Sequence, residues 1–259
     1  MLSEIVSVFQ PLSLAGILTG VWILVMISVP VVRWVAGEGA EHVGIAAGVF
    51  AQVAAVLAAL ATSFGFWVLL VIVIVPVLGW ASEAIGSRVG VPFGDYHYTD
   101  VLQPQVAHVP VLIPLAWLMM MPPAWAVGAL VAPSSPVMQW VVAAAAFTAW
   151  DVYLDPMMVS WDFWRWPKGG RYLGIPLVNY LGWFAVAFAI TALVALLGRA
   201  VGVPLVGGVP AGPLALIYAV TWALMVIGQF VFWKLRASAI AGFIAMGVFV
   251  VLMVVTVGL

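Results

Sequence analysis

The chain has 259 residues, of which 66% are apolar and only 7% are charged. Soluble domains carry about 25% charged residues, so this composition excludes a soluble protein and indicates an integral membrane protein. There is no cysteine, which excludes disulfides and thiolate metal sites, and a net charge of -1 without a basic tail argues against a nucleic-acid partner. We expect an all-α polytopic membrane helix bundle in which residues 1–259 form a single domain.

Eight apolar stretches are long enough to cross a hydrocarbon core about 30 Å thick. They cover approximately residues 11–32, 43–62, 65–85, 106–127, 137–155, 176–198, 212–233 and 238–258. The first lacks the basic flank and cleavage site of a signal peptide, so we expect a retained helix. The second and third form one run from Val43 to Trp80, too long for one crossing, and we predict a turn at Thr62-Ser-Phe-Gly65. Pro110 and Pro114 are expected to kink the fourth.

The basic residues divide unequally between the two membrane faces that eight crossings define. Arg199 lies on the face that also holds both termini. The opposite face carries Arg33, Arg88, Arg165, Lys168, Arg171, Lys234 and Arg236. Short cytoplasmic loops are enriched in Lys and Arg, so this face should be cytoplasmic and both termini should lie outside a cell membrane. Most acidic residues follow the same face, which predicts an active site toward the cytoplasmic side.

The third stretch ends in Trp80-Ala-Ser-Glu-Ala-Ile-Gly86, which contains the first candidate, Glu83. Carboxyl groups are costly in or beside a bilayer and are usually functional there. Glu83 could handle protons, or it could pair with Arg88 at the interface.

The loop that follows contains Asp95-Tyr-His-Tyr98. His97 could donate or relay a proton, and Tyr96 and Tyr98 could contact a substrate. In the alternative interpretation this is an interfacial loop whose tyrosines contact lipid headgroups.

Asp151 and Asp155 are four residues apart near the end of the fifth stretch. On a helix they share one face, about 6 Å apart along the axis. Two poorly solvated carboxyl groups this close cannot both ionise easily, so one would hold a proton at neutral pH and could act as an acid. Alternatively, Asp155 only caps a turn that begins at Pro156.

Two further candidates follow this pair. The cluster Trp161-Asp-Phe-Trp-Arg-Trp166 could stabilise a carbocation or lie along a polyene, or form an aromatic belt at the interface. Asn179 could orient water or a carboxyl group, or only join two helices. The three histidines are dispersed and no His-Glu-x-x-His motif is present, so we expect no metal site.

Six segments carry a family resemblance: Glu83–Gly86, Gly90–Tyr98, Val109–Trp117, Trp150–Val159, the pair Trp164-x-Trp166, and Tyr172–Trp183. Together they resemble the membrane carotenoid hydratase family, whose members hydrate the open psi-ends of gamma-carotene, lycopene and bisanhydrobacterioruberin. It implies a cofactor-free hydro-lyase of the cell membrane that acts on an acyclic carotenoid (C40 or C50) and water. Other membrane enzymes of the carotenoid pathway would be its partners.

Hydration of a trisubstituted alkene begins with protonation to a tertiary cation, which water then attacks. We expect Asp151 or Asp155 to be the acid, and the other carboxylate to stabilise the cation and act as base. Glu83, His97 and Asn179 would position water and resupply protons. The residues expected to line the substrate end are Tyr96, Tyr98, Trp166 and Trp183, together with Asn179.

Two other classes remain open from the sequence. Asp151-x-x-x-Asp155 also resembles one of the two Asp-rich motifs of magnesium-dependent membrane prenyltransferases, with Arg165, Lys168 and Arg171 as phosphate ligands, although a second such motif is missing. A non-enzymatic carotenoid-binding or transport protein is the third interpretation. Transport favours polar groups spread through the depth of the bundle, whereas here they gather at one end.

Overall fold

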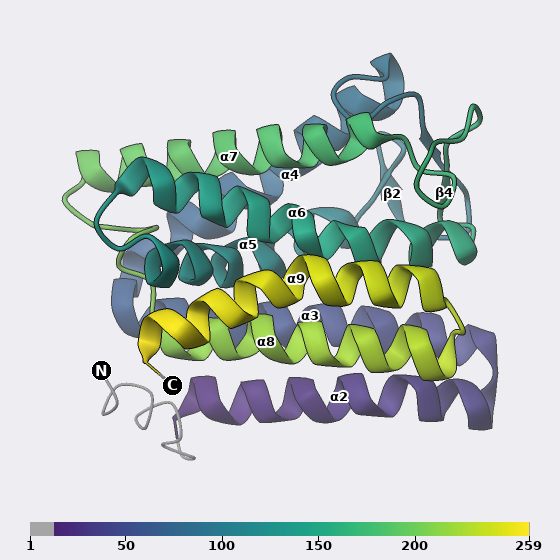
Figure 1. Cartoon of the computed structure of the whole chain (residues 1–259), viewed down its shortest axis with the longest axis horizontal. Helices are drawn as coiled ribbons and strands as arrows, with labels where there is room; N and C mark the ends of the chain where they lie inside the picture. Colours follow the sequence, from purple (N-terminus) through teal and green to yellow (C-terminus); the bar gives the residue numbers. More distant parts are fainter. Residues whose placement is uncertain (1–12, 259) are drawn as a thin grey trace.

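The computed structural model describes residues 13–258, apart from the side chains of residues 38 and 40–42. Within this part of the chain lie eight long α-helices (Figure 1): α2 Leu14–Ala36, α3 Glu38–Phe64, α4 Val68–Val89, α5 Leu112–Val131, α6 Pro136–Ser160, α7 Leu177–Ala200, α8 Ala211–Ile227 and α9 Arg236–Val257. A short π-helix, Gly228–Phe232, extends α8. The all-α membrane bundle predicted from the sequence is confirmed, whereas the predicted start of the first span at residue 11 lies outside the described residues.

A turn at Gly65 separates two of these helices. Seven helical stretches in the described chain are long and apolar enough to cross a membrane, and one of them, Val43–Val89, has 47 residues. A straight helix of that length would measure about 70 Å, roughly twice the thickness of a hydrocarbon core. The backbone of Gly65 has a φ of 51°, and a 3-10 turn at Gly65–Trp67 separates α3 from α4. The predicted turn is therefore confirmed.

The prolines of the fourth predicted span lie elsewhere than expected. Pro110 belongs to a short strand before α5, and Pro114 lies in the first turn of this helix, where a missing backbone N–H breaks no helical hydrogen bond. The prolines inside α5 are Pro122 and Pro123, both buried. The expectation that Pro110 and Pro114 kink this helix was wrong because the helix begins six residues later than predicted.

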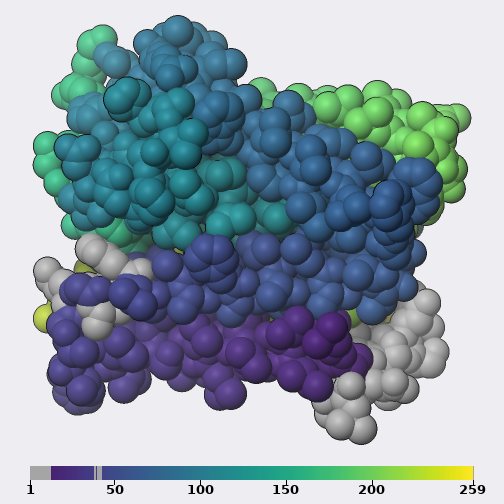
Figure 2. Space-filling view, turned by 180° about the vertical axis from the view of Figure 1, so that it is seen from behind, coloured from purple at the N-terminus to yellow at the C-terminus, as the bar shows by residue number. Residues whose placement is uncertain are grey.

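Helices α5 and α6 form the centre of the bundle. In α5, 67% of the apolar window is buried inside the protein, and in α6 50%, against 22% in each of α2 and α9. Successive helices run in opposite directions, so α2 begins and α9 ends at the same end of the bundle (Figure 1). Helices α2 and α3 pack side by side and form one edge of the molecule, as Figure 2 shows from behind.

The opposite end of the bundle carries a small cap built from two loops. The loop between α4 and α5 contains β1 His97–Tyr98, β2 Gln105–Val106 and β3 Val109–Pro110, and the loop after α6 contains β4 Trp164–Arg165. Strands β1 and β4 pair antiparallel, with Tyr98 opposite Trp164. The cap therefore joins the loop after α4 to the loop after α6 (Figure 1).

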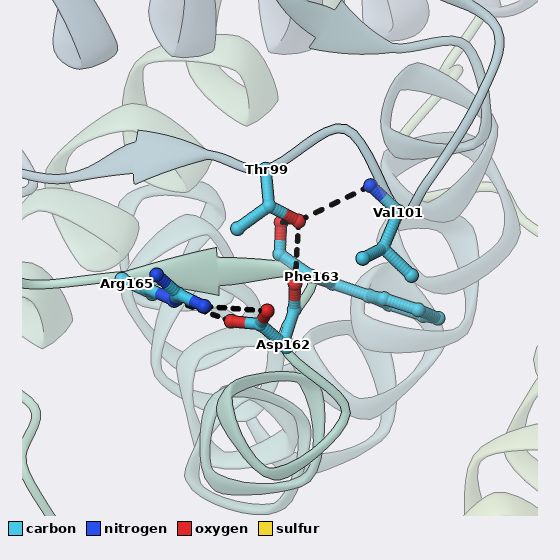
Figure 3. A network of polar contacts seen from close by, with 5 residues as sticks. All are labelled: Thr99, Val101, Asp162, Phe163 and Arg165. Carbon is cyan, nitrogen blue, oxygen red and sulfur yellow. Dashed lines mark hydrogen bonds and ion pairs between the residues drawn. The ribbon is translucent and has the colours of Figure 1, made fainter.

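Thr99 strengthens this junction (Figure 3). Its hydroxyl donates to the carbonyl oxygen of Asp162, and its backbone N–H donates to the carbonyl of Phe163 at 3.0 Å. The hydroxyl oxygen of Thr99 also accepts from the N–H of Val101 at 3.3 Å. Arg165 holds the carboxyl group of Asp162 through two nitrogens, with Nη2 to Oδ2 at 2.6 Å. These contacts hold the two loops of the cap together.

Candidate active site

Two carboxyl groups of α6 meet one amide of α7 inside the bundle. Asp151 and Asp155 lie one turn apart and are fully buried, with 0% and 1% exposure. Asn179 lies near the beginning of α7 and is also buried. Its Nδ2 donates to Asp151 Oδ2 at 3.0 Å and to Asp155 Oδ2. A single amide therefore bridges the predicted acid pair.

The remaining oxygens of the pair differ in their surroundings. Asp155 Oδ1 accepts a hydrogen bond from the indole of Trp164 at 3.0 Å. Asp151 Oδ1 is buried and receives no hydrogen bond from the described residues, and the two carboxyl groups share the Nδ2 donor of Asn179. Two adjacent buried negative charges with only neutral donors around them are very unfavourable. The arrangement favours one shared proton between Asp151 and Asp155.

Glu83 is the third carboxyl group and comes from α4. It is 3% exposed and accepts hydrogen bonds from Tyr98 at 2.9 Å, from Trp117 at 3.3 Å and from Tyr96. Burial, and then the proximity of Glu83, raise the pKa of Tyr96 and of Tyr98 well above the ordinary value of 10.0, so both phenols stay protonated as donors. Glu83 is thus held by neutral donors from the cap and from α5, while Arg88 lies exposed at the end of α4.

Aromatic rings surround these carboxyl groups. Trp117 stacks on Trp183 with ring centres 4.9 Å apart and an angle of 12° between the planes, and Phe147 lies 4.9 Å from Trp117. Trp166 packs on Tyr96 at 5.6 Å and donates from its indole N–H to the carbonyl of Phe93 at 3.1 Å. Aromatic faces carry a negative quadrupole, so this environment suits a cation better than an anion.

A cavity of about 20 Å³ lies among these groups, and we call it the polar cavity. Five side chains with carboxyl, hydroxyl or amide groups contribute to its lining: Glu83, Asp155, Tyr96, Tyr98 and Asn179. A water molecule needs roughly 10–15 Å³ of such space and two to four polar partners. The polar cavity therefore has the size and the lining to hold one water molecule next to Asp155 and Glu83.

A larger cavity of about 120 Å³, the apolar cavity, adjoins the first one. Side chains of α2, α3, α5, α6 and α8 line it, almost all of them apolar. Four residues line both cavities: Ile113, Ala116, Leu154 and Trp164. The carboxyl groups thus lie beside an oily space, separated from it by one layer of side chains.

The sequence model of a family described as carotenoid biosynthesis protein matches residues 43–255. The chain belongs to this family. No curated protein and no solved structure matches it. Carotenoids are long apolar molecules, so a family role in their synthesis agrees with an oily cavity inside a membrane bundle. All three carboxyl groups of the site lie in the matched region, whereas α2, which lines the apolar cavity through Trp22, Met26 and Val29, lies outside it.

In this carotenoid biosynthesis protein, most residues predicted from the sequence come together. The polar cavity is lined by seven of them: Glu83, Tyr96, Tyr98, Asp155, Trp166, Asn179 and Trp183. Asp151 lies directly behind, bound to Asn179. Side chains alternate along a strand, so His97 faces away from Tyr98; it is exposed, opposite Arg165 in the ladder, and lies outside the cavity lining.

The hydrogen-bonding roles of Trp117 and Trp164 were not predicted. Each donates its indole N–H to a carboxyl group, Trp117 to Glu83 and Trp164 to Asp155. The sequence offered one signal for these roles. A buried indole N–H needs a hydrogen-bond acceptor, and side-chain acceptors are few in this chain, so a tryptophan in an apolar segment or in the cap is a candidate donor to a buried carboxyl group.

The basic residues considered as phosphate ligands lie outside the cluster. Arg165 pairs with Asp162 and lowers the pKa of that carboxyl group through its hydrogen bonds, and Lys168 pairs with Asp95 at 3.1 Å. Both pairs are on the exposed side of the cap. Among the described side chains, which leave out residues 38 and 40–42, no three His, Asp or Glu groups converge in a way suited to a metal ion.

Proposed function

We propose that this carotenoid biosynthesis protein hydrates the terminal carbon–carbon double bond at the psi-end of an acyclic carotenoid. The observation that carries the proposal is a buried acid pair, surrounded by neutral donors, beside a water-sized cavity that adjoins an apolar one. General acid catalysis of this kind needs a protonated carboxyl group, a positioned water molecule and a water-poor pocket for the alkene.

Asp155 is the proton donor in this proposal, because its side chain lines the polar cavity while that of Asp151 does not. The proton moves from the Asp155 carboxyl group to the less substituted alkene carbon, and the π bond breaks to give a tertiary cation at its neighbour. The shared proton of the acid pair makes Asp155 available in its neutral form, and Asp151 carries the remaining charge.

Water in the polar cavity then adds to the cation and forms the new C–O bond. The surplus proton passes to Glu83, which lines the same cavity and whose donors from Tyr96, Tyr98 and Trp117 hold its oxygens in place. Return of this proton to Asp155 completes the cycle, so the net reaction adds one water molecule and leaves the protein unchanged. The stacked rings of Trp117 and Trp183 would stabilise the cation.

The test is expression of the chain in a lycopene-producing bacterium, followed by mass spectrometry of the extracted pigments. We expect a gain of one water mass for each reacted end, and the same gain in isolated membranes treated with EDTA. A gain of prenyl mass that EDTA abolishes would instead support a prenyltransferase. Lycopene that remains unchanged, although the protein is present in the membrane, would contradict hydration of this substrate.

The proposal includes a location. We infer a multi-pass protein of the cell membrane whose site faces the cytoplasm. The support is that Arg33, Arg88 and Lys234, together with the basic residues of the cap, lie at the end of the bundle that carries the site.

A further inference from the structure

The apolar cavity lies between the α2–α3 edge and the centre of the bundle. Trp22 and Met26 line it from α2, Gly48 and Val49 from α3, and Met119 from α5. On α6 its lining extends from Trp150 to Met158, about 12 Å along the helix axis at 1.5 Å per residue. The cavity therefore extends along the bundle for somewhat less than half of a hydrocarbon core, which is about 30 Å thick.

The lining suits a stiff conjugated chain. It includes five of the protein's methionines: Met26, Met119, Met157, Met158 and Met225. Methionine side chains are polarizable and adapt to the shape of a neighbour, and the flat faces of tryptophans such as Trp22 and Trp164 pack well on π systems. The indole N–H of Trp22 is buried and has no acceptor among the described residues, and a π face can accept such a weak hydrogen bond.

The wall between the two cavities fixes which end of a bound molecule meets the acid. Leu154 lies next to Asp155 in sequence and lines both cavities, as do Ile113, Ala116 and Trp164. A molecule in the apolar cavity can reach Asp155 only past these side chains. Its tip must therefore be slender and acyclic to pass between them, because the polar cavity beyond has space for only one water molecule.

We propose that the apolar cavity binds one end of a linear isoprenoid chain, lengthwise between α2–α3 and α5–α6–α8, with Leu154 at the point where the terminal double bond passes to Asp155. This inference rests on the proposed function for its chemistry, although binding can be measured without turnover. It assigns Met119 and Trp22 to substrate binding and Leu154 to the selection of acyclic ends.

The experiment labels the purified full-length protein with a diazirine derivative of geranylgeraniol and maps the labelled residues by mass spectrometry. We expect label on peptides that contain Met119, Met157 or Met158, and loss of this label in excess lycopene. Label restricted to lipid-facing residues, or label that lycopene does not displace, would overturn the proposal. Because the unsubstituted protein supplies this result, it does not depend on any variant folding.

Two matched pairs of variants refine the test. Met119→Trp should reduce competed labelling roughly tenfold, since it fills the cavity, whereas Met138→Trp on the exposed face of α6 should not. Leu154→Trp should keep labelling but lose product, in contrast to Leu181→Trp, which is 70% exposed. If lycopene displaces the label from the unsubstituted protein but no hydration is found, only the proposed function is contradicted. If hydration is found but the label lies outside the apolar cavity, only the assignment of the cavity is contradicted.

Discussion

Tyr98 and Trp164 lie directly opposite each other in the β1–β4 ladder, and each donates a hydrogen bond to a different buried carboxyl group. The Tyr98 hydroxyl binds Glu83 of α4, and the Trp164 indole binds Asp155 of α6. Their rings pack edge to face at 5.6 Å. One pair of cap residues thus sets the position of two acidic groups from separate helices, so the cap is part of the site and does more than cover it.

Removal of single carboxyl groups tests the assigned roles. Asp155→Asn should lower hydration by about a hundredfold to ten-thousandfold, the usual contribution of a general acid. Asp151→Asn should lose a similar amount, because the shared proton disappears, and Glu83→Gln should slow the step that removes the surplus proton. The measurement is product per unit of membrane-inserted protein in lycopene-producing cells.

The control for these variants is Asp100→Asn, an equivalent change on the exposed part of the cap. It should leave hydration unchanged. Near-normal turnover by Asp155→Asn would remove that residue from the proposed mechanism, and pigment that still co-purifies with each inactive variant would show that binding survived.

Asn179 should matter for stability as well as for activity. Asn179→Leu keeps a similar volume but removes the donor to Asp151 and Asp155, which leaves buried acceptors unpaired. The expected loss is about 1–3 kcal/mol of the free energy of unfolding. Thermal unfolding of the detergent-solubilised protein measures this, and an unchanged midpoint would mean that the bridge contributes little.

Gly79 determines the position of Trp117. A Cβ atom at this position would lie 2.7 Å from Cγ of Trp117, so Gly79→Ala must displace the ring that donates to Glu83 and stacks on Trp183. We expect a loss of about 1–3 kcal/mol in stability and a fall in turnover. Gly20→Ala on α2 is the matched control, since nothing lies within 4 Å of the added atom. In a helix that change should stabilise by up to about 1 kcal/mol, and equal effects of the two variants would contradict the assignment.

The stability of the protein at alkaline pH should depend on the two buried phenols of Tyr96 and Tyr98. The pKa values of Tyr96 and Tyr98 are raised above the ordinary value of 10.0 by burial and by Glu83, so folding favours their protonated forms. Their contribution to stability is complete below pH 10.0 and declines as the pH rises above it, because only the unfolded chain then releases these protons. The thermal midpoint of unfolding is measured below and above this pH. Its decrease between the two conditions should be smaller in Tyr96→Phe and in Tyr98→Phe than in the unsubstituted protein.

The parts of the site that the sequence predicted are those that depend on local geometry. Asp151 and Asp155 share one face of a helix whatever the tertiary fold, so their spacing in the sequence was enough to predict that they lie together. The meeting of Glu83 with this pair depends on how α4 packs beside α5 and α7, which no local pattern encodes. The sequence nevertheless indicated Glu83 as a candidate, because a carboxyl group in a membrane segment is costly and usually has a function.

His97 illustrates the limit of local reasoning. Composition marked the whole segment Asp95–Tyr98 as polar. Its last two residues form strand β1, in which alternation turns Tyr98 toward Glu83 and His97 toward solvent. A two-residue strand gives too short a pattern to predict from sequence. The roles of Trp117 and Trp164 were missed for a related reason, since an indole N–H acts as a donor only where a distant acceptor meets it.

The orientation in the membrane can be tested with unusual clarity because the chain contains no cysteine. Lys168→Cys places a single thiol on the cap, where the side chain is 83% exposed, and Ser134→Cys places one in the exposed turn between α5 and α6 at the opposite end. If the cap is cytoplasmic, a membrane-impermeant maleimide added to intact cells should label Ser134→Cys and not Lys168→Cys. Permeabilised cells should show label on both, which controls for accessibility. The reverse pattern in intact cells would place the site on the outer side and overturn the orientation inferred from the basic residues.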